Sequence, residues 1–247
     1  MSNYYPESDN VVIDNGQNVK ASSGALSFAK VFLYMFIGLA ITTAVAFGIG
    51  GVIYASLMNG ADSALVGNVY LGLLISSAIA LFILMIIINF VTLRGRHSIL
   101  VPAILYAILM GVLLSSFTIL IDWRILGMAF GITSGIFLLM TLIAVLTKGN
   151  LSPLLMVGMG LLFGSLILAL INWLIQSTMI MWIVSFAVFA AMMFITMFDI
   201  WNIKKICEKG AMSNNLALYC AFTLYVDFIY ILIRIIYFLI IIFGSKR

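Results

Sequence analysis

Residues 69–93 read VYLGLLISSAIALFILMIIINFVTL and contain no Asp, Glu, Lys, Arg or His. An α-helix needs about 20 apolar residues to cross the hydrocarbon core of a bilayer, so this stretch predicts a transmembrane helix. Runs of similar length and apolar character follow at residues 31–57, 98–121, 125–147, 153–175, 178–200 and 216–243. The sequence therefore predicts an all-α membrane protein with seven transmembrane helices.

The overall composition leads to the same fold class. Hydrophobic residues make up 65% of the 247 positions and charged residues only 8%, whereas a soluble domain carries roughly 25% charged residues. Seven spans occupy residues 28–247 and leave no room for a soluble catalytic domain, so we expect neither enzymatic activity nor a cofactor. Residues 1–27 are polar and are expected to form a disordered tail. Two cysteines, Cys207 and Cys220, are too few for a disulfide framework.

The positions of Lys and Arg between the spans predict the orientation in the membrane. Eight of them fall on the side of the N-terminus: Lys20, Lys30, Arg94, Arg96, Lys148, Lys204, Lys205 and Lys209. The other side holds three: Arg124, Lys246 and Arg247. We therefore expect a cytoplasmic N-terminus and an outer C-terminus, with a re-entrant last segment as the alternative. Short loops and an uncleaved start favour a bacterial plasma membrane, with a eukaryotic internal membrane as the alternative. Topology explains the basic residues better than nucleic-acid binding does.

Small residues recur at the spacing of a helix face in two of the spans. Gly127, Gly131 and Gly135 lie four residues apart, as do Gly160 and Gly164. Glycines on one face let two helix backbones approach closely in lipid. We expect these glycines to serve helix packing and to have no chemical role.

Three charged residues lie inside the predicted spans: Asp199, Asp227 and Arg234. A charge near the middle of the bilayer costs on the order of 3 kcal/mol, so such residues normally face the bundle interior and mark functional sites. Asp199 is near the cytoplasmic end of the sixth span, and Asp227 is about a dozen residues into the seventh. The two spans run antiparallel across a short loop, so the carboxyl groups can lie close together at similar depth.

Two carboxyl groups in a poorly solvated site cannot both ionise cheaply, and they titrate in coupled steps. Such a pair is sensitive to protons, and in its ionised form it attracts cations. Arg234 follows Asp227 by seven residues and shares its helix face, about 10 Å further along the axis. The alternative to a functional site is an interior salt bridge that only holds helices together.

Three segments carry a resemblance to a known family. Residues 146–152 read LTKGNLS, residues 198–204 read FDIWNIK, and residues 224–230 read LYVDFIY ahead of Arg234. Their order and spacing resemble the Bax inhibitor-1 family of membrane proteins, from about Pro102 to the end of the chain. That family has a Thr-Lys-x-Asp-Leu-Ser loop, an aromatic-Asp exit from the sixth span, and a last helix reading Leu-Tyr-Leu-Asp-Phe-Ile-Asn.

The resemblance implies six helices around a central seventh and, in bacterial members, a pH-sensitive calcium leak. Asp199 and Asp227 match the two aspartates that form the proton sensor and would bind calcium weakly and transiently. Arg94, or with less support Arg96, falls where the family has an arginine that latches onto them. The chain departs from the family pattern at two of these positions, with Asn150 in place of the loop aspartate and Tyr230 in place of an asparagine.

Other functions can be weighed against the same residues. A non-conducting regulator that binds a membrane protease or a stress-response protein is the main alternative. An aspartyl intramembrane protease would need Gly-x-Gly-Asp, but Asp227 follows Leu-Tyr-Val. A rhodopsin would need a lysine where the last helix has Arg234, and the single histidine, His97, is predicted to be a solvated loop residue.

Overall fold

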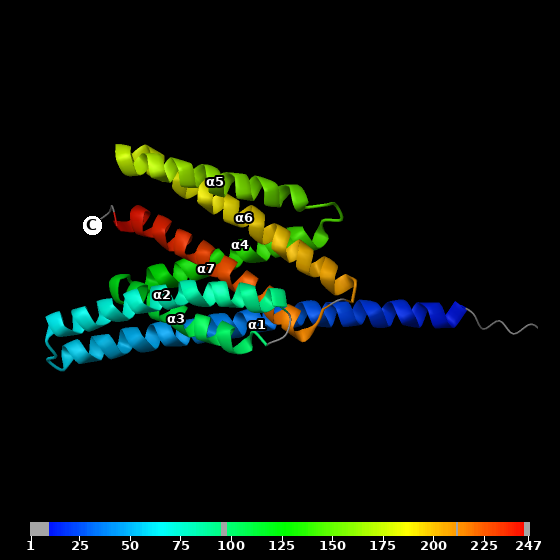
Figure 1. Cartoon of the computed structure of the whole chain (residues 1–247), viewed down its shortest axis with the longest axis horizontal. Coiled ribbons are helices and arrows are strands. Elements are labelled where there is room, and N and C mark those ends of the chain that lie inside the picture. Colours follow the sequence, from blue (N-terminus) through cyan, green and yellow to red (C-terminus); the bar gives the residue numbers. More distant parts are fainter. Residues whose placement is uncertain (1–9, 95–97, 211, 245–247) are drawn as a thin grey trace, which may run out of the picture.

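The computed structural model describes residues 10–94, 98–210 and 212–244, which form one helical bundle (Figure 1). The helices are α1 (Asn10–Met58), α2 (Ser63–Arg94), α3 (Leu100–Leu120), α4 (Trp123–Leu146), α5 (Ser152–Ile175), α6 (Thr178–Glu208) and α7 (Asn214–Gly244). Each of the seven contains a stretch long and apolar enough to span a membrane. The predicted all-α fold with seven candidate membrane spans is confirmed.

The chain starts and finishes at opposite ends of this bundle. The C-terminal ends of α2, α4 and α6 lie at the end of the bundle from which the first turns of α1 project, and we call this the basic end (Figure 1). The C-terminal ends of α1, α3, α5 and α7 lie at the other end, called the far end. Helix α7 is continuous over 31 residues, about 46 Å, so it is long enough to cross a bilayer without the break that a re-entrant segment needs. Helix α1 extends back to Asn10, within the segment for which we expected a tail.

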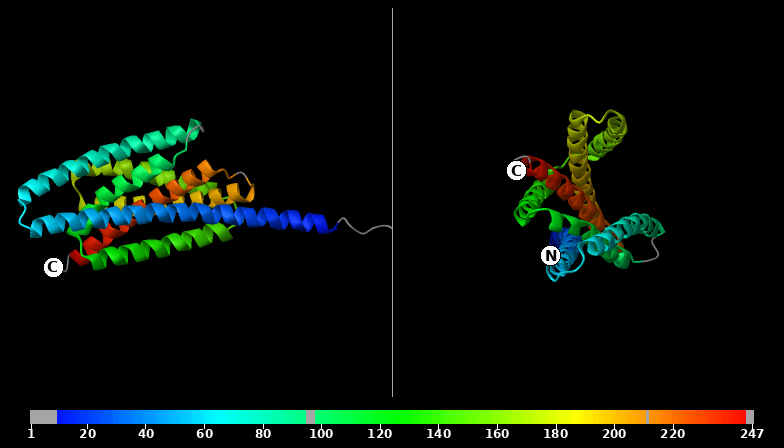
Figure 2. Two further views of the ribbon diagram at one scale, coloured as in Figure 1. Left: turned by 90° about the horizontal axis from the view of Figure 1, so that it is seen from below. Right: turned by 90° about the vertical axis from the view of Figure 1, so that its left-hand side faces the viewer.

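Helix α7 has the most extensive set of neighbours. It packs against α1, α2, α3, α4 and α6, whereas α5 packs against α6 alone among the described residues. Figure 2 (right) shows the bundle end-on, with α5 outside α6 and away from α7. A closed ring of six helices around α7 is therefore not seen.

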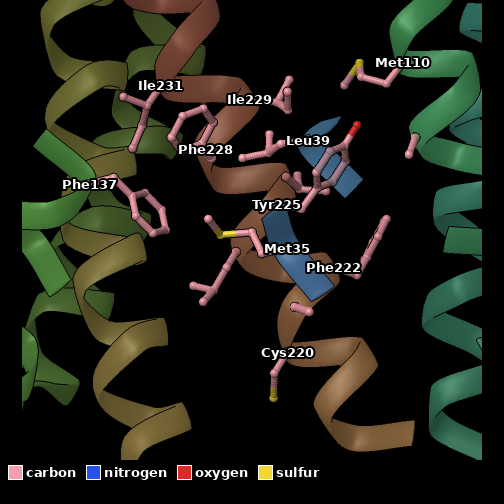
Figure 3. Packing of buried hydrophobic residues seen from close by; sticks show 14 of the residues in the cluster. Met35, Leu39, Met110, Phe137, Cys220, Phe222, Tyr225, Phe228, Ile229 and Ile231 are labelled. Atoms are coloured by element: carbon pink, nitrogen blue, oxygen red, sulfur yellow. The ribbon is translucent and has the colours of Figure 1, made fainter. Parts of the chain in front are cut away.

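The core forms where α7 meets α1, α3 and α4. The Tyr225 hydroxyl and the Thr42 hydroxyl of α1 are 2.7 Å apart, and Thr42 also donates to the Ala107 carbonyl oxygen of α3 at 3.0 Å. Phe228 packs against Phe137 of α4, with ring centroids 5.5 Å apart (Figure 3). Because these hydroxyl groups bond to one another, they fix the contact of three helices without exposing polar atoms to lipid.

The short connection between α3 and α4 does not produce a closely packed helix hairpin. Asp122 caps α4, since its side chain accepts from the Arg124 backbone N–H at 3.1 Å. Beyond this turn α3 packs mainly on α1 and α2, while α4 packs on α6 and α7. The two helices therefore diverge after the turn and do not form a closely packed pair.

The predicted packing role of five glycines is also wrong. A Cβ atom added at Gly127, Gly131, Gly135, Gly160 or Gly164 would meet nothing within 4 Å. The close approaches instead occur at Gly50 and Gly111, between α1 and α3, and at Gly158, between α5 and α6. Regular spacing along one helix therefore did not identify the glycines that contact a neighbouring helix.

Gly111→Ala is expected to lower the free energy of unfolding by at least about 1 kcal/mol, the usual cost of overpacking. The added Cβ would lie 2.7 Å from the Thr42 carbonyl oxygen and 2.7 Å from Val45 Cβ, so the backbones must separate. Denaturant unfolding in detergent measures the change, and Gly135→Ala is the matched control. Equal stability of the two variants would show that α1 and α3 can part freely.

Candidate functional site

The candidate site lies between α6 and α7, where the sequence predicted two neighbouring aspartates. Asp199 comes from α6 and Asp227 from α7. The Asp199 side chain lies within hydrogen-bonding reach of the Asp227 carboxyl group, and the Thr196 side chain of α6 also reaches it. The structure therefore brings together the two acids that are 28 positions apart in the sequence.

The two aspartates differ in exposure, which corrects the expectation of a buried pair. Asp227 is 5% exposed, whereas Asp199 is only partly buried. Among the described residues, Asp227 Oδ2 is a buried side-chain atom without a hydrogen-bond partner that meets ordinary geometry. A buried carboxyl oxygen without a partner is costly to stability. This oxygen is therefore available to take up a proton or to coordinate a cation.

The site offers few ligands for a metal ion. Within the part of the chain that the structure describes, no group of three His, Cys, Asp or Glu side chains lies close enough to hold one. Ca²⁺ prefers six to eight oxygen ligands. The carboxyl groups of Asp199 and Asp227 with the Thr196 hydroxyl supply too few oxygens for tight binding, so only brief coordination of a cation fits.

Helix α7 carries a polar stripe, which we define as Tyr219, Thr223, Asp227, Tyr230, Arg234 and Tyr237. At 100° per residue these positions share one side of the helix, and they extend about 27 Å along its axis. That length is close to the thickness of the hydrocarbon core. Tyr219 of the stripe contacts Asn89 of α2, and Asp227 contacts Asp199 of α6. Among the described residues α2 and α6 do not pack on each other, and α7 is visible between them in Figure 1.

Arg234 lies in this stripe and is partly buried. In the described ranges it has no ion pair with Asp199 or Asp227, so the interior salt bridge considered from the sequence is not seen. The ion pair that is observed joins Lys204 and Glu208 at the basic end, at 3.7 Å. A structural salt bridge across the site therefore does not explain these charges.

Of the arginines expected to act as a latch, the two near the end of α2 lie wholly or partly outside the described residues. Arg96 and His97 lie outside the described residues, and Arg94 is the last residue of α2, with its side chain also outside them. Five residues before Arg94, Asn89 Oδ1 accepts a hydrogen bond from the Tyr219 hydroxyl at 3.3 Å. This contact brings the end of α2 beside the start of the polar stripe.

Asn150 has a structural role that the sequence did not reveal. Its Oδ1 atom accepts from the Ser152 backbone N–H at 3.0 Å and from the Ser152 hydroxyl at 2.7 Å, at the start of α5. An aspartate would accept the same two hydrogen bonds. The departure from the family pattern at this loop therefore preserves these two hydrogen bonds at the start of α5.

Comparison with known proteins agrees with this architecture. Residues 25–245 match the family described as "Inhibitor of apoptosis-promoting Bax1". The chain is 28% identical over 251 aligned positions to the inner membrane protein YbhL of Escherichia coli strain K12, covering 98% of this chain and 99% of that protein. YbhL of Escherichia coli O6:H1 gives the same identity and coverage. This chain, an integral membrane protein, belongs to the Bax inhibitor-1 family, which is not known to be enzymatic.

Proposed function

We propose that this protein is a pH-sensitive cation leak, with calcium as the permeant ion and the Asp199–Asp227 pair as proton sensor and gate. The observation that carries the proposal is the Asp227 carboxyl group, which is 5% exposed in a membrane helix, has an unpartnered Oδ2 atom and faces a second acid. An intramembrane acid in this setting is functional by default, because its cost to stability is otherwise not offset.

Weak coordination supports a leak more than storage of the ion. Conduction needs a site that a cation enters readily and leaves readily. Two carboxyl groups of unequal exposure meet this need, since Asp199 is partly solvated while Asp227 is buried. The polar stripe of α7 continues on both sides of Asp227, which gives an ion polar contacts over the thickness of the hydrocarbon core.

The gate follows from the charge of the pair. At neutral pH the pair carries a negative charge and holds a cationic side chain, for which Arg94 is the first candidate and Arg96 or Arg234 the others. Protons neutralise the pair, release the arginine and let the helices part, so flux rises as pH falls. Asp227 lies about 12 Å beyond Tyr219 along α7. Arg94 therefore reaches the pair only if α2 moves along α7 from its described position beside Tyr219.

The placement in the membrane is part of the proposal. The excess of Lys and Arg at the basic end supports a cytoplasmic N-terminus. The similarity to an inner membrane protein supports a bacterial plasma membrane. Residues 1–27 are proposed as a cytoplasmic tail outside the spans, and six helices around α7 remain the proposed arrangement of the closed state.

The test is calcium flux into liposomes that contain the purified protein and an enclosed calcium dye. We expect flux above that of empty liposomes, larger at pH 6 than at pH 8. The Asp199→Asn, Asp227→Asn double variant should lose this pH response. Asp62→Asn is the control, since Asp62 is an exposed acid at the far end that caps α2 through the Ala64 backbone N–H. Unchanged flux and pH response in the double variant contradict the proposal.

The same preparation separates the leak from the non-conducting regulator. Cross-linking in native membranes followed by affinity purification tests for a stoichiometric protein partner. Such a partner, together with flux no higher than in empty liposomes, supports the regulator. Flux by the purified protein alone supports the leak.

A further inference from the structure

A second site lies on the other side of α7, away from the two aspartates. A cavity of about 440 Å³, which we call the α1–α4 cavity, opens between α1 and α4 near the far end. This volume is in the range of pockets that hold apolar ligands, about 300–1,000 Å³. The backbones of α1 and α4 do not pack against each other, and the last turns of α7 lie behind the space between them (Figure 2, left).

The wall of the α1–α4 cavity is apolar in effect. Its three hydroxyl groups, on Thr42, Thr43 and Thr118, each donate to a backbone carbonyl oxygen. The rest of the lining, from α1, α3, α4 and α7, is aliphatic, aromatic or glycine. Because the three hydroxyl groups already donate within the protein, this wall suits a hydrocarbon ligand.

The cavity opens toward the membrane and not toward another helix. On its rim Phe47 is 55% exposed, Phe130 45% and Trp123 73%, while Ile229 at its floor is 1% exposed. The rim from Trp123 to Phe130 extends about 10 Å along α4. That distance corresponds to much of one leaflet of a hydrocarbon core about 30 Å thick. The Phe130–Phe228 ring pair, at 5.6 Å between centroids, closes the deep end.

A positively charged side chain, that of Arg124, lies at the end of the cavity lined by Trp123. Arg124 is exposed, with its guanidinium group 5.7 Å from the ring centroid of Trp123. In the described chain Arg124 has no ion-pair partner, and the neighbouring Asp122 side chain accepts from a backbone N–H. Tryptophan and arginine together at the first turn of a membrane helix suit the headgroup level, and a guanidinium group binds phosphate through two parallel hydrogen bonds.

We propose that the α1–α4 cavity binds one acyl chain of a phospholipid from the far leaflet, with the lipid phosphate held by Arg124. Trp123 packs along the upper part of the chain, and Phe130 with Phe228 stops it. An empty cavity forfeits dispersion contacts along its whole lining. A lipid chain recovers them, because hydrocarbon is the solvent at the opening. This site is independent of the aspartate pair and of ion flux.

Native mass spectrometry of the full chain released from phospholipid-containing micelles tests the proposal. We expect the wild type to keep one phospholipid, and Gly127→Leu, which fills the cavity, to reduce retention at least about tenfold, the effect of about 1.4 kcal/mol. Gly131→Leu is the matched control, one turn further along α4, equally open and outside the cavity lining. Equal retention in Gly127→Leu and wild type, or a protein dimer without lipid, overturns the proposal.

Arg124→Gln separates the headgroup from the chain. We expect it to weaken retention of phospholipid about tenfold while diacylglycerol, which lacks the phosphate, is retained as in the wild type. Lys148→Gln, a change of the same charge in the loop after α4 at the basic end, is the control. Equal retention of phospholipid by Arg124→Gln and wild type removes Arg124 from the site.

A fluorescence measurement covers the case in which Gly127→Leu fails to fold. Trp123 and Trp173 are similarly exposed, at 73% and 78%, and both lie near the far end, but only Trp123 lines the α1–α4 cavity. The emission of Trp123 is the difference between the wild type and Trp123→Phe, and the emission of Trp173 is the difference between the wild type and Trp173→Phe. We expect phospholipid with brominated chains to quench Trp123 at a several-fold lower mole fraction than Trp173. Equal quenching curves contradict a bound chain.

Discussion

Replacing Asp227 by Asn is expected to remove the pH dependence of cation flux and to raise flux at neutral pH about thirtyfold. The gain corresponds to the loss of one charge-assisted hydrogen bond of about 2 kcal/mol that holds the closed state. In the wild type the pair carries a negative charge at neutral pH and binds the latch arginine, whereas Asn cannot carry that charge at any pH. Flux of Asp227→Asn should therefore be equally high at pH 6 and pH 8.

The matched variant Asp199→Asn should have a smaller effect, only severalfold. Asp199 is partly solvated and Asp227 is 5% exposed, so water weakens an interaction at Asp199 more than at Asp227. Calcium-dye liposomes at the two pH values measure both variants, with Asp62→Asn as the charge control. A larger effect of Asp199→Asn, or a wild-type pH response in Asp227→Asn, would place the sensor elsewhere.

The positions of the helices could be predicted from the sequence because hydropathy reports transfer into lipid. Residues 69–93 and four of the other apolar runs lie wholly within helices, and the runs 98–121 and 125–147 extend past their helices by only one or two residues at an end. The meeting of Asp199 and Asp227 was also predictable, because one short loop makes α6 and α7 antiparallel neighbours and charged side chains avoid lipid. These inferences rest on a contrast between polar and apolar residues, which the sequence displays directly.

The contrast between polar and apolar residues could not predict how the helices pack against one another. Lipid tails are as apolar as a helix surface, so hydrophobicity does not separate the side that faces lipid from the side that faces a neighbour. Gly127, Gly131 and Gly135 are regularly spaced yet lie open, while Gly111 alone allows a close approach in its helix. The Thr42–Tyr225 contact was missed for the same reason, since isolated threonine and tyrosine residues recur throughout the spans.

Asp227→Leu is expected to raise the free energy of unfolding by about 2 kcal/mol while it abolishes the pH response. A carboxyl group in a membrane core costs on the order of 3 kcal/mol, and the greater volume of leucine offsets part of the gain. The observation behind this prediction is the Oδ2 atom, which is buried without a hydrogen-bond partner. Denaturant unfolding in detergent measures the difference from the wild type.

Thr223→Val is the control for that measurement, because Thr223 lies one turn earlier in the polar stripe and donates to the Tyr219 carbonyl oxygen at 3.1 Å. We expect it to change stability by less than about 1 kcal/mol. If Asp227→Leu instead destabilises the protein by several kcal/mol, the aspartate holds helices together and the structural interpretation of the pair is correct. A stabilised but unresponsive protein shows the opposite, that Asp227 is kept at a cost to stability because the gate needs an ionisable group there.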